Sequence, residues 1–119
     1  MRDFRDIKAW HKAHALVLRI YEASAGLPVE ERYGLTSQMR RAAVSISANI
    51  AEGTGRDGDA DLRRFLLIAT GSASEVEYLV LLAHDLGVIP QDRQQALQND
   101  IEEVKRMLSA FIIKLTANR

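Results

Sequence analysis

Apolar residues recur every three or four positions along four stretches of the chain. These stretches cover approximately residues 6–25, 35–53, 59–86 and 91–117. Such spacing places the apolar side chains on one face of an α-helix. The expected apolar stripe of the first helix consists of Ile7, Trp10, Ala13, Val17, Ile20 and Tyr21. That of the second helix consists of Leu35, Met39, Ala42, Ala43, Ile46 and Ile50. Both prolines, Pro28 and Pro90, and most of the glycines lie near the ends of these stretches, as is typical of turns. No stretch alternates strictly between apolar and polar residues, so the sequence predicts an all-α protein.

The connections between the four expected helices are short, which favours antiparallel packing of consecutive helices. The expected architecture is therefore an up-down antiparallel four-helix bundle. Asp6 is a suitable N-cap for the first helix, and Gly26 is a suitable C-cap residue. A chain of 119 residues fits one compact domain, which we expect to span residues 1–119.

The second and third expected helices have too little charge for ordinary surface helices. Residues 42–51 and residues 65–74 contain no charged side chain, whereas a surface helix normally shows one charged face. Either the bundle itself buries these helices all round, or another copy of the chain covers them, and we favour the second interpretation. Gly71 lowers helix propensity by roughly 1 kcal/mol relative to alanine, which indicates close packing at that point. The expected interface residues are Val44, Ala48, Ala51 and Gly71.

A polar stripe runs beside the apolar face of the second helix. Its members follow spacings of three, four, four and three: Gln38, Arg41, Ser45, Asn49 and Glu52. Ser72, Glu75 and Tyr78 on the third helix are natural hydrogen-bonding partners for it. Such a seam is either a ligand-binding or catalytic groove, or a hydrogen-bonded network that fixes the register of two helices. We favour the network, because no histidine or set of metal ligands converges there.

Charge and cysteine content narrow the function classes. The chain has 16 basic and 16 acidic residues, a balance that argues against a general polyanion binder. The absence of cysteine excludes disulfides, thiolate catalysis and cysteine-ligated metals. Residues 1–56 carry 9 basic and 6 acidic side chains, and residues 57–119 carry 7 and 10. This asymmetry indicates charge pairing within the fold or, less favoured, head-to-tail contact between copies.

No motif carries recognisable catalytic chemistry. The stretch from Gly53 to Gly58 has the G-x-G-x-x-G spacing, but a helix precedes it where a dinucleotide-binding loop needs a strand. The Glu-x-x-His pairs of a di-iron bundle are absent. His11 and His14 share a helix face without a third metal ligand. We therefore expect a protein that is not an enzyme, with no catalytic residue, metal site or cofactor.

Five arginines around the connection of the second and third helices form the strongest basic feature. They are Arg40, Arg41, Arg56, Arg63 and Arg64. Gathered around one turn, they would contact phosphate groups of a nucleic acid. The alternative, which we favour, is ion pairing with nearby acidic residues. Those acids are Glu52, Asp57, Asp59 and Asp61.

The beginning of the chain has no apolar core of the signal-peptide type. The longest runs without a charged residue are ten residues long, which is too short to span a bilayer. We expect a cytoplasmic protein without a membrane partner.

Three segments of the chain form a recognisable pattern. They are Tyr33-Gly34-Leu35, Gln38-x-Arg40-Arg41-Ala42-Ala43-x-Ser45-Ile46-x-x-Asn49-Ile50-Ala51-Glu52-Gly53 and Ile68-Ala69-x-Gly71-Ser72-x-x-Glu75. On these residues, the chain resembles the four-helix bundle proteins first described as encoded by intervening sequences of bacterial 23S ribosomal RNA genes, over about residues 4–90. It is also similar to the accessory proteins of diversity-generating retroelements, which engage reverse transcriptase and nucleic acid.

The resemblance implies a bundle assembled into a homopentamer, with no established enzymatic activity. The similarity to retroelement accessory proteins implies a role beside nucleic acid or a ribonucleoprotein. We therefore expect a non-enzymatic oligomeric scaffold or adaptor, and the alternative is a nucleic-acid-binding accessory protein.

Overall fold

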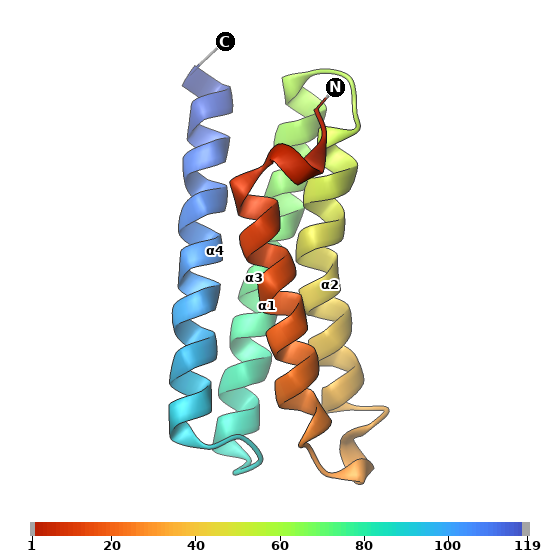
Figure 1. Ribbon diagram of the computed structural model, residues 1–119, viewed down its shortest axis with the longest axis vertical. Helices are drawn as coiled ribbons and strands as arrows, with labels where there is room; N and C mark the ends of the chain where they lie inside the picture. The colour runs from red at the N-terminus through yellow and green to blue at the C-terminus, as the bar shows by residue number, and fades with distance from the viewer. Residues whose placement is uncertain (1, 118–119) are drawn as a thin grey trace.

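The computed structural model describes residues 2–117, and four long helices dominate it (Figure 1). They are α1 (Lys8–Ala25), α2 (Leu35–Thr54), α3 (Asp59–Asp85) and α4 (Gln91–Ala117), with short 3-10 helices η1 (Phe4–Asp6) and η2 (Val29–Glu31). No strand occurs in this part of the chain, so the all-α prediction is confirmed. Each of the four helices begins and ends within two residues of the range that its apolar spacing indicated.

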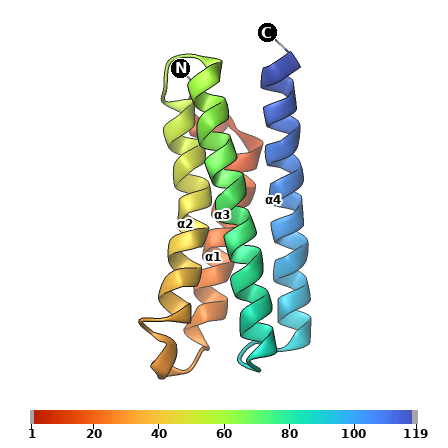
Figure 2. The ribbon, with the colours of Figure 1, turned by 180° about the vertical axis from the view of Figure 1, so that it is seen from behind.

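The four helices run alternately up and down and form an elongated bundle of 47 × 23 × 19 Å. Each helix packs against the next, and α1 packs against α4, so that the bundle is closed. Seen from behind, α2 and α3 lie side by side along most of their length (Figure 2). Residues 2 and 117 lie at the same end of the bundle.

The start of α1 differs from the expectation. Asp6 belongs to η1, and the N-cap of α1 is Ile7, whose side chain cannot accept a hydrogen bond from the helix. The capping carboxylate sits earlier, where Asp3 accepts a hydrogen bond from the backbone N–H of Arg5 at 2.9 Å. The 3-10 turn takes the place of the first helical turn, because the chain must bend here to reach α2. Gly26 is the C-cap residue of α1, as predicted.

The end of α3 is set by a left-handed glycine. Gly87 has φ +78°, a conformation that costs other residues steric strain. Its N–H donates to the carbonyl of His84 at 2.9 Å, and the N–H of Val88 donates to the carbonyl of Ala83 at 3.0 Å. These two bonds satisfy carbonyls that the helix end leaves open, and they turn the chain toward Pro90 and α4.

The core is one apolar cluster, and all four helices contribute side chains to it. All six residues of the stripe predicted for α2 are buried: Leu35, Met39, Ala42, Ala43, Ile46 and Ile50. The buried hydroxyls of Ser24, Ser47 and Thr54 donate to carbonyl groups of their own helices. No buried side-chain polar atom in the described residues lacks a hydrogen-bond partner.

By length and mean hydropathy alone, α3 could cross a membrane. The longest uncharged runs of the sequence did not identify this helix. The bundle buries 39% of its most apolar 18-residue window. Two acidic residues near the middle of the helix, Glu75 and Glu77, pair with Arg41 of α2 and Lys105 of α4. Apolar residues therefore lie on both sides of α3, the side that faces the core and the side that is exposed.

Candidate functional site

A small polar network joins α2 and α3 halfway along the bundle. The hydroxyl oxygens of Ser45 and Ser72 lie 2.8 Å apart. The amide nitrogen of Asn49 donates to the backbone carbonyl of Ser45 at 2.8 Å and to its hydroxyl oxygen at 3.1 Å. Ser72 is buried, and Ser45 and Asn49 are half-buried. Because each of these side chains has a hydrogen-bond partner, the network can hold the register of the two helices.

The remaining members of the predicted seam lie further out. Arg41 forms a salt bridge with Glu75 of α3, one turn from the serines. Glu52 is exposed and pairs with Arg56 at 2.9 Å, near the end of its own helix. Gln38 is exposed near the start of α2. Of the eight residues expected here, the structure therefore brings five together across α2 and α3. It places Gln38 and Glu52 at the ends of the stripe, and Tyr78 is 59% exposed.

Apolar side chains cover the exposed side of α2 and α3. On α2, Val44 is 39% exposed, and Ala48 and half-buried Ala51 lie beside it on the helix. The α3 side chains are more exposed: Leu67 at 45%, Ile68 at 43%, Tyr78 at 59% and Leu81 at 47%. We call the exposed set Val44, Ala48, Leu67, Ile68, Gly71, Tyr78 and Leu81 the outer face. Exposed apolar side chains that gather on two neighbouring helices often mark an interaction site.

Gly71 lies in the middle of the outer face. A Cβ atom added there would meet no atom within 4 Å, so the bundle itself supplies no packing reason for this glycine. Gly53 is the opposite case, because a Cβ there would lie 2.8 Å from Cβ of Phe65 and 3.1 Å from Cδ1 of Leu62. The close approach of α2 and α3 within the bundle is therefore made at Gly53.

The five arginines do not gather around one turn. Arg40 and Arg41 lie in the second turn of α2, roughly 20 Å along the helix from Arg56 at ~1.5 Å per residue. Arg40 faces α1, where it donates to the hydroxyl of Ser24 at 2.8 Å and lies over the ring of Tyr21 at 4.5 Å. The predicted convergence is wrong for this pair, because consecutive residues of a helix point about 100° apart and both lie far from the loop.

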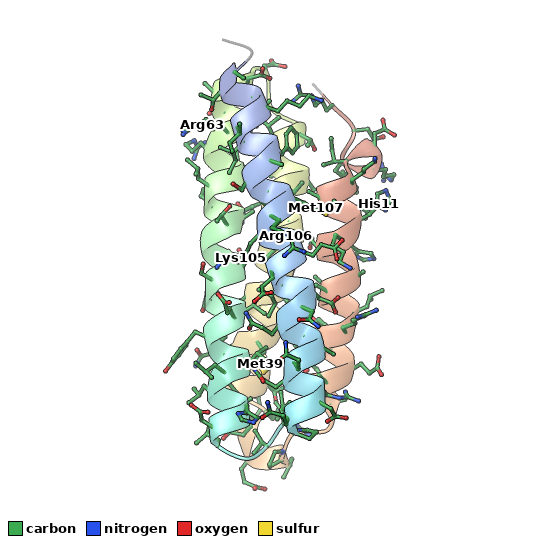
Figure 3. The ribbon with its side chains drawn as sticks, turned by 90° about the vertical axis from the view of Figure 1, so that its left-hand side faces the viewer. His11, Met39, Arg63, Lys105, Arg106 and Met107 are labelled. Carbon is green, nitrogen blue, oxygen red and sulfur yellow. The ribbon has the colours of Figure 1, made fainter. Side chains whose placement is uncertain are left out.

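The other three arginines lie near the α2–α3 loop. Arg56 and Arg64 both lie over the ring of Phe65, at 5.1 and 4.5 Å from its centre. Arg64 also pairs with Asp61 at 3.5 Å. Arg63 points toward α4, where it donates to the hydroxyl of Thr116 at 3.3 Å (Figure 3). Acidic partners reduce the positive potential of this end, as the alternative interpretation expected.

An aromatic cluster at the start of α1 was not predicted as a unit. Trp10 lies between Phe4, at 4.7 Å between ring centres, and His14, whose ring is stacked at 4.9 Å with an angle of 7°. The guanidinium of Arg5 lies 4.5 Å over the ring of Phe4, and His11 contacts the carbonyl of Arg5 at 2.6 Å. The four-residue spacing of Trp10 and His14 indicates that they lie on one face of α1. The contact with Phe4 was not predictable from spacing, because it depends on the bend at η1.

Two polar links to α4 were also missed. Glu77 of α3 accepts hydrogen bonds from the amide of Gln98 and, at 3.0 Å, from the ammonium of Lys105 (Figure 3). The Gln98 bond, followed by that of Lys105, holds the pKa of the Glu77 carboxyl below its ordinary value of 4.5, and partial burial opposes this shift. Asp100 is buried and pairs with Arg19 and, at 3.6 Å, with Lys12, both on α1.

These polar groups are paired with one another rather than aimed at a common point. Within residues 2–117, no group of three histidine or acidic side chains is placed to hold a metal ion. The arrangement can fix helix register and present an apolar outer face.

Comparison with known proteins agrees with the resemblance seen in the sequence. The family model described as 23S rRNA-intervening sequence protein matches residues 5–110. A crystal structure of a protein of unknown function from the S23 ribosomal protein family of Bacteroides thetaiotaomicron is 28% identical, with a TM-score of 0.81. That match covers 87% of this chain and 97% of the Bacteroides chain. No curated protein matches the chain significantly, and nothing in these matches concerns retroelement accessory proteins. The chain therefore belongs to the 23S rRNA-intervening sequence protein family.

Proposed function

We propose that this protein is a non-enzymatic, cytoplasmic scaffold or adaptor that works as a homo-oligomer, with the pentamer as the expected assembly. The observation that carries the proposal is the outer face. Residues 42–51 and 65–74 are uncharged, and their exposed side chains lie next to each other because α2 and α3 pack side by side. Leaving such a surface in water is unfavourable by about 25 cal/mol for each Å² of apolar area.

Gly71 and Ala48 specify the kind of partner. Both are exposed and small, so that the backbone of another helix can approach closely. The space around Gly71 that the bundle leaves empty is available for such a helix. Another copy of this chain offers a helical surface of this kind.

Charge supports self-association as well. The formal net charge is zero, so copies of the chain do not repel one another through net charge. The residues of the outer face carry no ionised side chain. Glu75, which lies between Gly71 and Tyr78 along α3, is paired with Arg41 of α2, so a partner that covers this pair buries no unpaired charge.

Light scattering coupled to size exclusion tests the proposal. We expect the protein to be an oligomer at micromolar concentration and Ala48→Glu to yield a smaller species that keeps its helical circular dichroism. Ala96→Glu is the matched control, because Ala96 is an exposed alanine of α4 away from the outer face. A monomeric native protein, or an oligomer that survives Ala48→Glu, would contradict the proposal, and an oligomer of another size would reject only the pentamer.

A nucleic-acid-binding accessory role is the second candidate, and the cluster of Phe4, Trp10 and His14 favours it. Unpaired bases stack on aromatic side chains, and the exposed cations Arg5 and Lys8 lie beside this cluster in sequence. Trp10 is the only tryptophan, so its fluorescence reports directly on the cluster. Titration with a single-stranded oligonucleotide should quench it, with an affinity that falls steeply as salt rises. Unchanged fluorescence at low salt would reject this role.

A further inference from the structure

The bundle is open at one end between α1 and α4. The 27 residues of α4 extend past the start of the 18-residue α1, by roughly 13 Å at ~1.5 Å per residue. Residues 2–7 do not fill the gap, because they turn toward α2 and α3. The N–H of Arg2 donates to the carbonyl of Thr54 at 2.8 Å, and its guanidinium lies 3.6 Å from Asp59. A cavity of about 520 Å³ remains beside the last turns of α4.

The walls of this cavity are mainly apolar. They come from the start of α1 and the end of α4 and consist of Ile7, Ala9, Met107, Ala110, Phe111 and Leu115. Alanines at two of these positions leave space that larger side chains would fill. Ile7, Met107 and Phe111 are only half-buried, so a ligand seated here would remove further apolar surface from water.

The charged groups around the cavity are unequal in sign. Arg2, Lys8 and Lys114 are cationic, and Asp6 is the one acidic lining residue in the described part of the chain. Among residues 2–117, neither Lys8 nor Lys114 takes part in a salt bridge, whereas Arg2 has Asp59. Two ammonium groups beside an apolar cavity favour a ligand with a negative charge.

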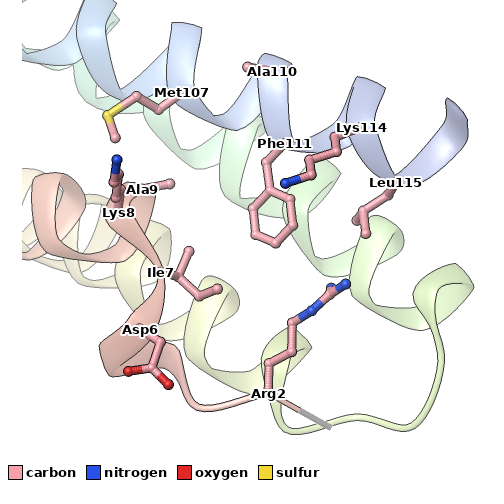
Figure 4. A pocket seen from close by; sticks show the side chains of 10 residues that line it. All are labelled: Arg2, Asp6, Ile7, Lys8, Ala9, Met107, Ala110, Phe111, Lys114 and Leu115. Carbon is pink, nitrogen blue, oxygen red and sulfur yellow. The ribbon is translucent and has the colours of Figure 1, made fainter. Parts of the chain in front are cut away.

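The close view shows how these groups lie (Figure 4). Ile7 and the ring of Phe111 point into the space between the two helices, and the ammonium of Lys114 lies near that ring. The guanidinium of Arg2 lies 5.7 Å from the centre of the same ring. The carboxylate of Asp6 points to the other side, away from Phe111. The acidic group therefore does not oppose an anion at the mouth of the cavity.

From this geometry we propose that the cavity binds a small amphiphilic anion, consisting of an apolar body and one carboxylate or phosphate group. The apolar body lies against Ile7, Met107 and Phe111. The ammonium groups of Lys8 and Lys114 lie on opposite sides of this apolar wall, and the anionic group pairs with one of them. A volume of about 520 Å³ is in the range of small-molecule sites, which combine apolar walls with few polar groups. The site lies between α1 and α4, so its occupation does not depend on the outer face or on the proposed oligomer.

Octanoate is a suitable probe, and octyl phosphate and octanol test its head group. Titration calorimetry gives the affinities, and the methyl resonances of isotopically labelled methionine locate the site. Met107 lines the cavity, whereas Met39 is buried in the core and serves as an internal control. We expect octanoate or octyl phosphate to shift the Met107 methyl and to leave Met39 unchanged. The tighter of the two ligands identifies the preferred anionic group.

Variants separate this site from general hydrophobic binding. Ala110→Trp should fill the cavity and abolish binding, whereas Ala96→Trp, at an exposed alanine near the other end of α4, should leave it unchanged. The double variant Lys8→Gln/Lys114→Gln should weaken octanoate about three- to fivefold and leave octanol unaffected. Arg93→Gln removes a cation near the start of α4 and should have no effect. Equal affinity for octanol and octanoate, binding that survives Ala110→Trp, or no binding of any probe would overturn the proposal.

Discussion

The hydroxyl oxygens of Ser45 on α2 and Ser72 on α3 lie 2.8 Å apart, between two helices that otherwise meet mainly through apolar side chains. Asn49 donates to the same Ser45 oxygen, so the contact is a connected network rather than an isolated pair. Sliding α3 by one turn against α2 would separate the two hydroxyls and break this hydrogen bond. The network therefore favours one register of the two helices.

Replacing Ser72 with alanine should destabilise the fold by about 0.5–1 kcal/mol, because the lost hydrogen bond outweighs the gain in helix propensity. Ser109→Ala is the matched control, since Ser109 is exposed within α4 and gains the same propensity. Urea unfolding monitored by circular dichroism measures both variants. Equal stabilities of the two variants would show that the Ser45–Ser72 contact contributes nothing.

Gly53→Ala should destabilise the protein by about 1–3 kcal/mol, because the new methyl group would force α2 away from Phe65 and Leu62. Gly55 provides the control two residues later. Its backbone is right-handed, with φ −81°, and a Cβ there makes only ordinary contacts, the nearest at 3.5 Å. Thermal unfolding should show a clear loss for Gly53→Ala and little change for Gly55→Ala. A tolerated Gly53→Ala would mean that α2 and α3 can separate without cost.

Glu77 should make the stability depend on pH in the acidic range. Its pKa in the folded protein is lowered, so its contribution is fully present above its ordinary pKa of 4.5 and is lost as pH falls through the folded value. Because the side chain is about one-third exposed, we expect a contribution below about 1 kcal/mol. Urea unfolding of the native protein and of Glu77→Gln between pH 6 and 3 should show a stability difference that shrinks toward pH 3. A difference independent of pH would contradict this role.

The salt bridge between Arg19 and Asp100 should be worth about 1 kcal/mol in a double-mutant cycle, because the carboxylate is buried while the guanidinium is largely exposed. Asp100→Ala alone should cost more than Arg19→Ala alone, since Asp100 also contacts Lys12. Lys12 keeps a second partner, Glu103, at 3.1 Å, which limits the loss. A coupling energy near zero would show that the Arg19–Asp100 pair contributes nothing to the contact between α1 and α4.

The helices and the apolar core were largely predictable, because the spacing of apolar residues every three or four positions indicates both a helix and its buried face. The stripe of α2 is buried at every predicted position. In α1 the prediction was weaker: Leu16 is buried although it was not in the expected stripe, and Tyr21, which was, is 43% exposed beneath Arg40. A broad apolar face gives several nearly equivalent stripes, and packing against the neighbouring helices selects among them.

Contacts between helices were predictable only where two stripes of similar chemistry faced each other. Ser72 and Glu75 were expected partners of the α2 seam because both helices carry polar residues at matching spacings. The contact between Glu77 and Lys105 was not predictable in this way, because the spacing of residues in α3 does not indicate which residue of α4 lies opposite Glu77. The cavity at Phe111 follows from the bend before α1, a feature that depends on the path of residues 2–7 rather than on periodicity.

Because an even number of antiparallel helices brings the chain back to its starting end, residues 2 and 117 lie at one pole, or end, of the bundle. Labels or cargo domains attached to the two termini would thus be neighbours, and the opposite pole, with the turns at residues 26–34 and 86–90, would stay uncovered. A donor and an acceptor fluorophore placed at these termini would transfer energy efficiently while α1 and α4 stay together. In a single molecule, the moment at which energy transfer is lost would show when α1 separates from α4.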